Sequence, residues 1–86
     1  MSEQDVLPLS KLKRGERAVI VSLDSGHLGL KLMEMGCLPG EEVLLKKVAP
    51  LGDPISIQIG SYLLSLRKNE AVAIKVRKIP LAVKTK

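Results

Sequence analysis

Aromatic residues are almost absent from this chain of 86 residues, which has no Phe or Trp and a single Tyr, Tyr62. Single-stranded nucleic acids and proline-rich peptides are bound mainly through aromatic platforms, so the chain is poorly equipped for both kinds of ligand. Cysteine and histidine are equally scarce, with Cys37 and His27 the single examples. One cysteine excludes an internal disulfide and is typical of a protein from a reducing compartment.

Long apolar runs are also missing. No stretch approaches the roughly 20 apolar residues that a membrane-spanning helix needs, and the polar Met1–Asp5 does not resemble a secretion signal. We therefore expect a cytoplasmic protein without direct membrane insertion. Apolar residues make up 45% of the chain, enough for the core of one small domain.

The net charge is +5, from 14 basic and 9 acidic residues. This excess permits attraction to phosphates or anionic lipid. The basic residues are spread along the chain, however, so we favour an ordinary basic, soluble surface and expect no nucleic-acid partner.

Residues 28–40 have the most informative pattern. Leu28, Leu32 and Met35 recur at helical spacing and should share a face, whereas Gly36 can take the left-handed conformation that ends a helix. Pro39-Gly40 then predicts a turn. Upstream, residues 24–26 offer an N-cap for this helix.

Five short strands are expected around this helix. Ile55–Ile59 alternates strictly and Gly60-Ser61 suits a two-residue hairpin loop, which places Ile59 opposite Tyr62, Ile57 opposite Leu64 and Ile55 opposite Leu66 on one apolar face. The predicted strands are 17–23, 42–49, 55–59, 62–66 and 73–77. Closure into a small five-stranded SH3-like barrel, all-β with one short helix at one end, would protect the sheet edges.

Two further local structures are expected. A single helical turn over residues 8–12 should bury Leu9 and Leu12, and Asn69 should cap a short turn over 70–72. The predicted organisation is a flexible segment over residues 1–8, the barrel domain over 9–78 and a tail over 79–86, with Pro80 discouraging further strand pairing.

Four segments in this order give the chain a family resemblance: Leu9–Glu16, Lys31–Gly40, Ala49–Pro54 and Ser65–Ala71. With them the chain resembles FeoA, the small cytoplasmic component of bacterial ferrous-iron transport systems, over nearly all of Leu9 to Val76. The combination of Met-Gly-x-x-Pro-Gly with Ala-Pro-Leu-Gly-Asp-Pro is the part of the resemblance that is specific to this family. Two positions depart from the family pattern: Lys31 stands where Arg is frequent, and Cys37 where Leu or Met is usual.

The resemblance implies an SH3-like barrel that binds and assists the membrane permease FeoB, which carries a cytosolic GTP-binding domain. A protein of this kind would lie peripherally at the inner membrane through its partner. The same barrel also occurs at the C-terminus of iron-dependent repressors, so a free-standing SH3-like regulatory module is the alternative.

Neither catalysis nor metal binding is indicated by the residues. Asp24, His27, Glu34 and Cys37 lie near the predicted helix but lack a paired ligand spacing such as Cys-x-x-Cys. We expect no catalytic residue, no metal site and no cofactor, and therefore a non-enzymatic protein.

A partner-binding surface is the remaining possibility. Leu30 and Met33 are left over when the helix buries its inner face, Leu63 should point away from the hairpin core, and Leu51 lies in a loop. The candidate partner-binding residues are Leu30, Leu32, Met33, Leu51 and Leu63, although Leu32 is also expected on the core face. The predicted function is that of an accessory protein docking on a ferrous-iron permease.

Overall fold

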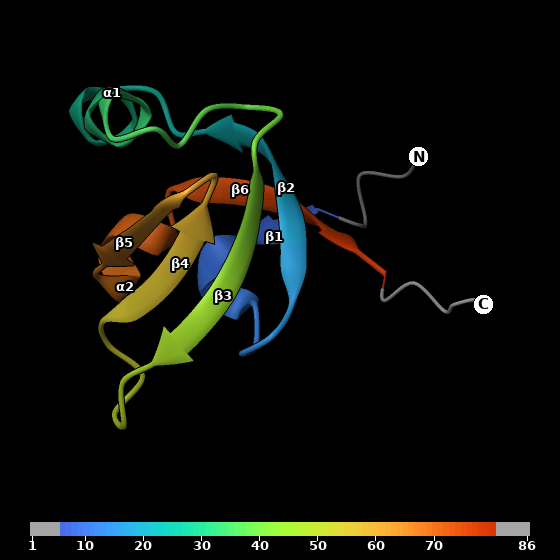
Figure 1. Cartoon of the computed structure of the whole chain (residues 1–86). Helices are drawn as coiled ribbons and strands as arrows, with labels where there is room; N and C mark the ends of the chain where they lie inside the picture. The colour runs from blue at the N-terminus through green and yellow to red at the C-terminus, as the bar shows by residue number, and fades with distance from the viewer. Residues whose placement is uncertain (1–5, 81–86) are drawn as a thin grey trace.

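The computed structural model of the protein describes residues 6–80, and Figure 1 shows its elements. They are β1 (Val6–Pro8), the single 3-10 turn η2 (Leu9–Lys11), β2 (Arg17–Leu23), α1 (His27–Glu34), β3 (Glu42–Val48), β4 (Ile55–Ile59), β5 (Tyr62–Leu66), α2 (Lys68–Ala71) and β6 (Ile74–Ile79).

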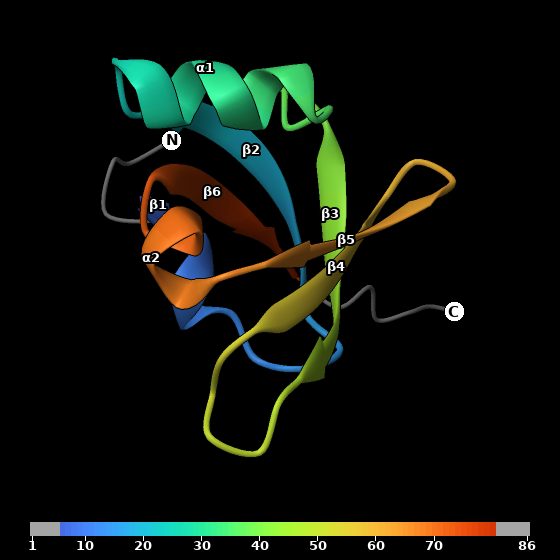
Figure 2. The same ribbon diagram turned by 90° about the vertical axis from the view of Figure 1, so that its left-hand side faces the viewer.

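The strands form one antiparallel sheet in the order β1-β6-β2-β3-β4-β5. It curls around the core as a partly open barrel, with α1 lying across one end (Figures 1 and 2). The five expected strands correspond to β2–β6, and the predicted all-β fold with one short helix is confirmed.

The domain boundaries differ from the prediction at both ends of the described chain. Residues 6–8 are not a flexible segment, because they form β1 and pair with Lys75–Arg77 of β6. The last strand continues to Ile79, which pairs with Arg17 of β2. The predicted looseness of residues 1–5 and the tail beyond Pro80 lie outside the described residues.

The β4–β5 hairpin has the predicted register, with Ile57 opposite Leu64 and Ile55 opposite Leu66. The third predicted pair, Ile59 opposite Tyr62, is present as well, with Ile59 buried and Tyr62 64% exposed. Figure 2 shows that the tip of this hairpin projects beyond the rest of the sheet.

The core is almost wholly aliphatic. Strand side chains at alternate positions supply most of it, as the period of two requires. The predicted turn at the start of the domain is present as η2, and it buries Leu9 completely and Leu12 almost completely. Among the described residues, no polar or charged residue belongs to the buried class.

The two helix starts differ in how well they were predicted. At α1 the N-cap is Gly26, within the expected residues 24–26, but no side chain accepts from the first turn. At α2 the prediction is wrong, because Asn69 lies within the helix. The Lys68 N–H donates to Asp53 Oδ1 (3.0 Å), and the Arg67 N–H donates to Glu70 Oε1 (2.9 Å).

The predicted end of α1 is confirmed. Gly36 has φ +107° directly after the C-cap Met35, a conformation that favours glycine.

Within residues 6–80, no helix combines the length and the apolar character that crossing a membrane would require.

Candidate partner-binding surface

Helix α1 is held on the barrel by its inner face. Leu32 is completely buried, and Leu28 and Met35 pack half-buried against the same core. Gly29 is also buried, and a Cβ at this position would overlap the backbone carbonyl oxygen of Asp24. Only glycine therefore allows this close approach of the helix to the preceding loop.

The outer side of the same segment is apolar as well. Leu30 is 57% exposed and Met33 39% exposed, three residues apart on one face of α1. Leu38, shortly after the helix, is also exposed. We call Leu30, Met33 and Leu38 the α1 apolar surface. Leu38 was not among the residues expected from the sequence, although its position between Gly36 and Pro39, where a turn was predicted, was a signal that it would remain outside the core.

Two ion pairs connect the α1 region to the rest of the barrel. Lys31 Nζ on α1 lies 3.6 Å from Glu70 Oε2 on α2, and Lys75 Nζ on β6 lies 3.8 Å from Asp24 Oδ1 in the loop before α1. Such partly exposed pairs contribute little to stability. The position of the helix therefore depends mainly on the burial of Leu32 and the Gly29 contact.

The structure does not bring the five predicted partner-binding residues together. Leu32 is completely buried, in agreement with its expected place on the core face, so its side chain is not available at the surface. Leu51 is exposed, but it lies in the loop between β3 and β4, at the end of the barrel opposite α1 (Figures 1 and 2). Leu63 is exposed on β5, an edge strand of the sheet. Leu30 and Met33 alone share an element.

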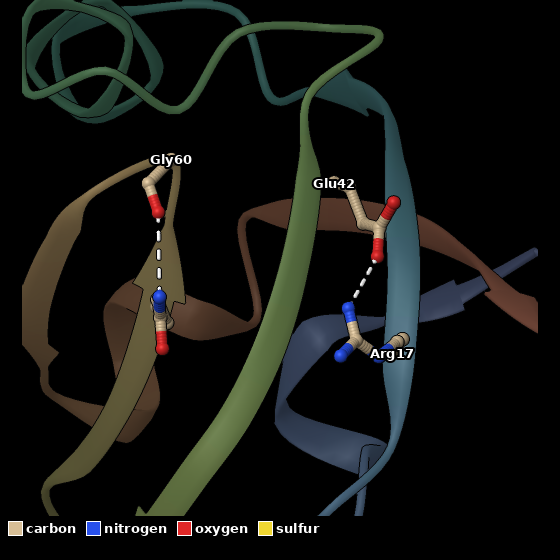
Figure 3. A network of polar contacts seen from close by, with 4 residues as sticks. Arg17, Glu42 and Gly60 are labelled. Carbon is tan, nitrogen blue, oxygen red and sulfur yellow. Dashed lines mark hydrogen bonds and ion pairs between the residues drawn. The ribbon is translucent and has the colours of Figure 1, made fainter.

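A shallow depression on the outer face of the sheet is a second candidate region for binding. Figure 3 shows the two polar contacts among the residues that line it. Arg17 Nη1 donates to Glu42 Oε2 at 2.8 Å, and Gln58 Nε2 donates to the Gly60 carbonyl at 3.4 Å. Both members of the ion pair are about half exposed, and their charges are already matched. This depression is therefore a solvated, self-paired surface.

The residues considered for catalysis and metal binding do not assemble into a site. Within residues 6–80, no group of three or more His, Cys, Asp or Glu side chains is arranged to hold a metal ion. Cys37 is buried, and burial raises the pKa of its thiol, which disfavours the reactive thiolate. His27 is exposed at the start of α1.

Two solved structures resemble this chain in both sequence and fold. Iron(II) transport protein A from Clostridium thermocellum is 47% identical with a TM-score of 0.79, over 85% of this chain and 46% of that one. FeoA of Stenotrophomonas maltophilia, crystallised with zinc and described as an SH3 domain protein, is 32% identical with a TM-score of 0.72, over 81% and 88% of the two chains. The fold is therefore SH3-like.

The barrel also resembles part of another protein, IdeR of T. acidophilum. The match covers 92% of this chain and 37% of that one, with a TM-score of 0.77. The two sequences are only 16% identical, so this likeness concerns the fold alone.

Family membership follows from two further comparisons. The model of the FeoA domain matches residues 7–78. A protein of Porphyromonas gingivalis, named as a fusion of Fe(2+) transport protein A and the Fe(2+) transporter FeoB, is 38% identical over 72 residues, which are 83% of this chain. The chain spans only 8% of the length of that fusion protein. Since the domain model covers nearly all of the described residues, the chain belongs to the FeoA family.

Proposed function

We propose that this protein is a non-enzymatic accessory protein of ferrous iron uptake, and that it docks through the α1 apolar surface on the cytosolic part of a FeoB-type permease. The protein would work in the cytoplasm and reach the inner membrane through that partner. The relative in which the same domain is joined to FeoB in one chain supports this partner, because fusion places the two parts permanently side by side.

The observation that carries the proposal is the two-sided burial pattern of α1. Leu32 is completely buried, while Leu30 on the other side of the helix is 57% exposed. An exposed leucine by itself is ordinary. Here, however, Leu30 and Met33 lie on one face of a helix whose inner face is packed on the barrel, and Leu38 follows shortly after that helix, so the apolar surface is already ordered before any partner arrives.

The test compares two neighbouring substitutions, Met33→Glu and Leu32→Gln. Met33→Glu puts a charge on the proposed contact, and burying that charge without a partner should weaken binding to the isolated cytosolic domain of the permease by at least about tenfold. Because Met33 is partly exposed, the melting temperature of the free protein should change little. Leu32→Gln should lower both stability and binding, since its side chain is in the core.

Titration calorimetry against the permease domain, with a thermal melt of each variant, measures both effects. Leu63→Glu is the matched control, because it adds the same charge at another exposed apolar side chain. If folded Met33→Glu binds as tightly as the parent protein, α1 is not the interface, and β5 with Leu63 or the loop with Leu51 becomes the region to test.

The alternative is a free-standing regulatory module related to the barrels of iron-dependent repressors. Its support is the fold likeness at 16% identity and the net charge of +5. Neither observation points to particular residues of this chain, whereas the permease proposal does.

A further inference from the structure

The end of the barrel opposite α1 concentrates basic residues. Residues 11–16 and 46–54 both lie there (Figures 1 and 2). Backbone hydrogen bonds join the first segment to Leu45, the residue directly before the second: Gly15 N–H donates to the Leu45 carbonyl (2.8 Å), and Leu45 N–H donates to the Glu16 carbonyl (3.0 Å). We call these two segments the basic end. Its basic side chains, all exposed, are Lys11, Lys13, Arg14, Lys46 and Lys47.

The acidic residues within the basic end already have hydrogen-bond or ion-pair partners within the protein. Glu16 accepts from the Lys13 N–H (2.7 Å) and lies 3.0 Å from Lys78 Nζ, and Asp53 accepts from the Lys68 N–H. Among the described residues, no side chain forms an ion pair with any of the five basic residues. Their positive charge is therefore available to an outside partner.

The same end presents an exposed leucine at the corner of a rigid turn. Gly52 N–H donates to the Ala49 carbonyl (2.7 Å), which closes a β-turn with Pro50 and Leu51 at its centre. A second bond from Ala49 N–H to the Pro54 carbonyl closes the loop behind it. Leu51 is 95% exposed, more than any other large apolar side chain among the described residues.

We propose that the basic end lies on an anionic membrane surface, with the five basic residues facing lipid phosphates and carboxylates and Leu51 entering the headgroup layer. Clustered Lys and Arg beside an apolar side chain are the combination that peripheral proteins use at such surfaces. The membrane is contacted and not spanned, yet this departs from the expectation that the protein makes no direct membrane insertion.

The charge distribution predicts which end of the barrel faces the membrane. The helix end, residues 24–42, contains four acidic residues and one basic residue, Lys31, whereas the basic end contains five basic and two acidic residues. Two of the four carboxylates at the helix end are paired with basic residues outside this range, Asp24 with Lys75 and Glu42 with Arg17. An anionic surface therefore attracts the basic end much more strongly than the helix end. The α1 apolar surface would then face away from the lipid, available to a protein partner.

Vesicle sedimentation with the full chain tests the proposal without the permease, so its outcome is separate from that of the docking proposal. The vesicles contain phosphatidylcholine alone or phosphatidylcholine with about one third phosphatidylserine. We expect binding to the anionic vesicles at low salt, loss of binding at high salt, and none to phosphatidylcholine alone.

Two test variants, each with a matched control variant, locate the contact. Lys46→Gln with Lys47→Gln should weaken vesicle binding by roughly 25-fold, at about fivefold for each charge removed. The matched control, Lys31→Gln with Lys75→Gln, removes the same charge away from the basic end and should have a much smaller effect. Leu51→Ser should weaken binding several-fold, and Leu63→Ser should not.

Three results would overturn the proposal. The first is no binding to anionic vesicles at low salt, and the second is an equal loss in the two double variants. The third is a Leu51→Ser variant that binds vesicles like the parent, which would make the basic end a general polyanion site; binding of duplex DNA at salt concentrations that release the vesicles would have the same meaning.

Discussion

The two ends of this barrel are built in different ways. The helix end is acidic and is closed by α1, which is buried on one side and apolar on the other. The basic end is closed by loops, and its most exposed apolar side chain, Leu51, lies at the corner of a turn. This small domain thus presents an ordered apolar helix face at one end and a charged surface with the highly exposed Leu51 at the other, which suits two different kinds of partner.

The largest effect is expected in the core that both ends share. Ile57 is completely buried on β4, between Leu45 of β3 and Leu64 of β5. Ile57→Ala should lower the free energy of unfolding by about 2–5 kcal/mol through lost burial and the remaining cavity. Urea unfolding measures this loss. Leu63→Ala, on the exposed side of β5, should cost less than about 1 kcal/mol, and a similar small loss for Ile57→Ala would contradict the described register.

A smaller loss of stability should affect the helix end of the barrel and leave the basic end unchanged. Gly29→Ala forces α1 away from the Asp24 carbonyl, and we expect a cost of about 1–3 kcal/mol, as for other overpacked sites. Hydrogen exchange should show faster exchange of the α1 amides with little change in β3 and β4. If α1 positions the docking surface, the same variant should lose permease binding and retain vesicle binding.

Gly52→Ala is the matched control for that experiment. Gly52 has φ +88°, and the space around it is open, since an added Cβ would meet no neighbouring side chain or backbone atom within 4 Å. Alanine there should therefore cause backbone strain of about 1–2 kcal/mol but no overlap. Its effect should be confined to the loop of the basic end. Faster exchange of the α1 amides in Gly52→Ala would show that the two ends are coupled.

The smallest effect concerns pH. The backbone N–H of Lys13 and the side chain of Lys78 lower the pKa of Glu16. The folded protein therefore holds this proton less tightly than the unfolded chain, and the contact stabilises the fold above the ordinary glutamate pKa. The stabilisation is lost as the pH falls through the lowered pKa. In urea unfolding, Glu16→Gln should be less stable than the parent at pH 7, and the difference should shrink in acid. Glu41→Gln is the control for loss of one charge.

Local patterns in the sequence predicted much of this fold. The alternation of residues 55–59 and the Gly60-Ser61 loop were sufficient for the hairpin register, because the paired strands are adjacent in the chain. The periodic leucines and Gly36 likewise predicted α1 and its end. Both signals depend on residues within a few positions of one another.

The features that were missed depend on distant residues. β1 is three residues long, and its partner β6 lies near the other end of the described chain. The acceptor at the start of α2 is Asp53, fifteen residues before Lys68. The close packing of Gly29 becomes visible only when the helix is placed on the barrel. The charge contrast between the ends needs the topology as well, since the whole helix end separates the two basic segments in the sequence.

The position of β6 has a consequence for how the protein folds during synthesis. Of the strands in residues 6–80, β6 is the last to be made, yet it lies between β1 and β2, the first two of them. Until it emerges from the ribosome, β1 has no neighbour in the sheet and β2 has only β3. Long-range pairing of this kind slows folding and leaves strand edges open in nascent chains. The barrel therefore closes only after translation has passed Ile79, and a chain stalled earlier would be a target for chaperones.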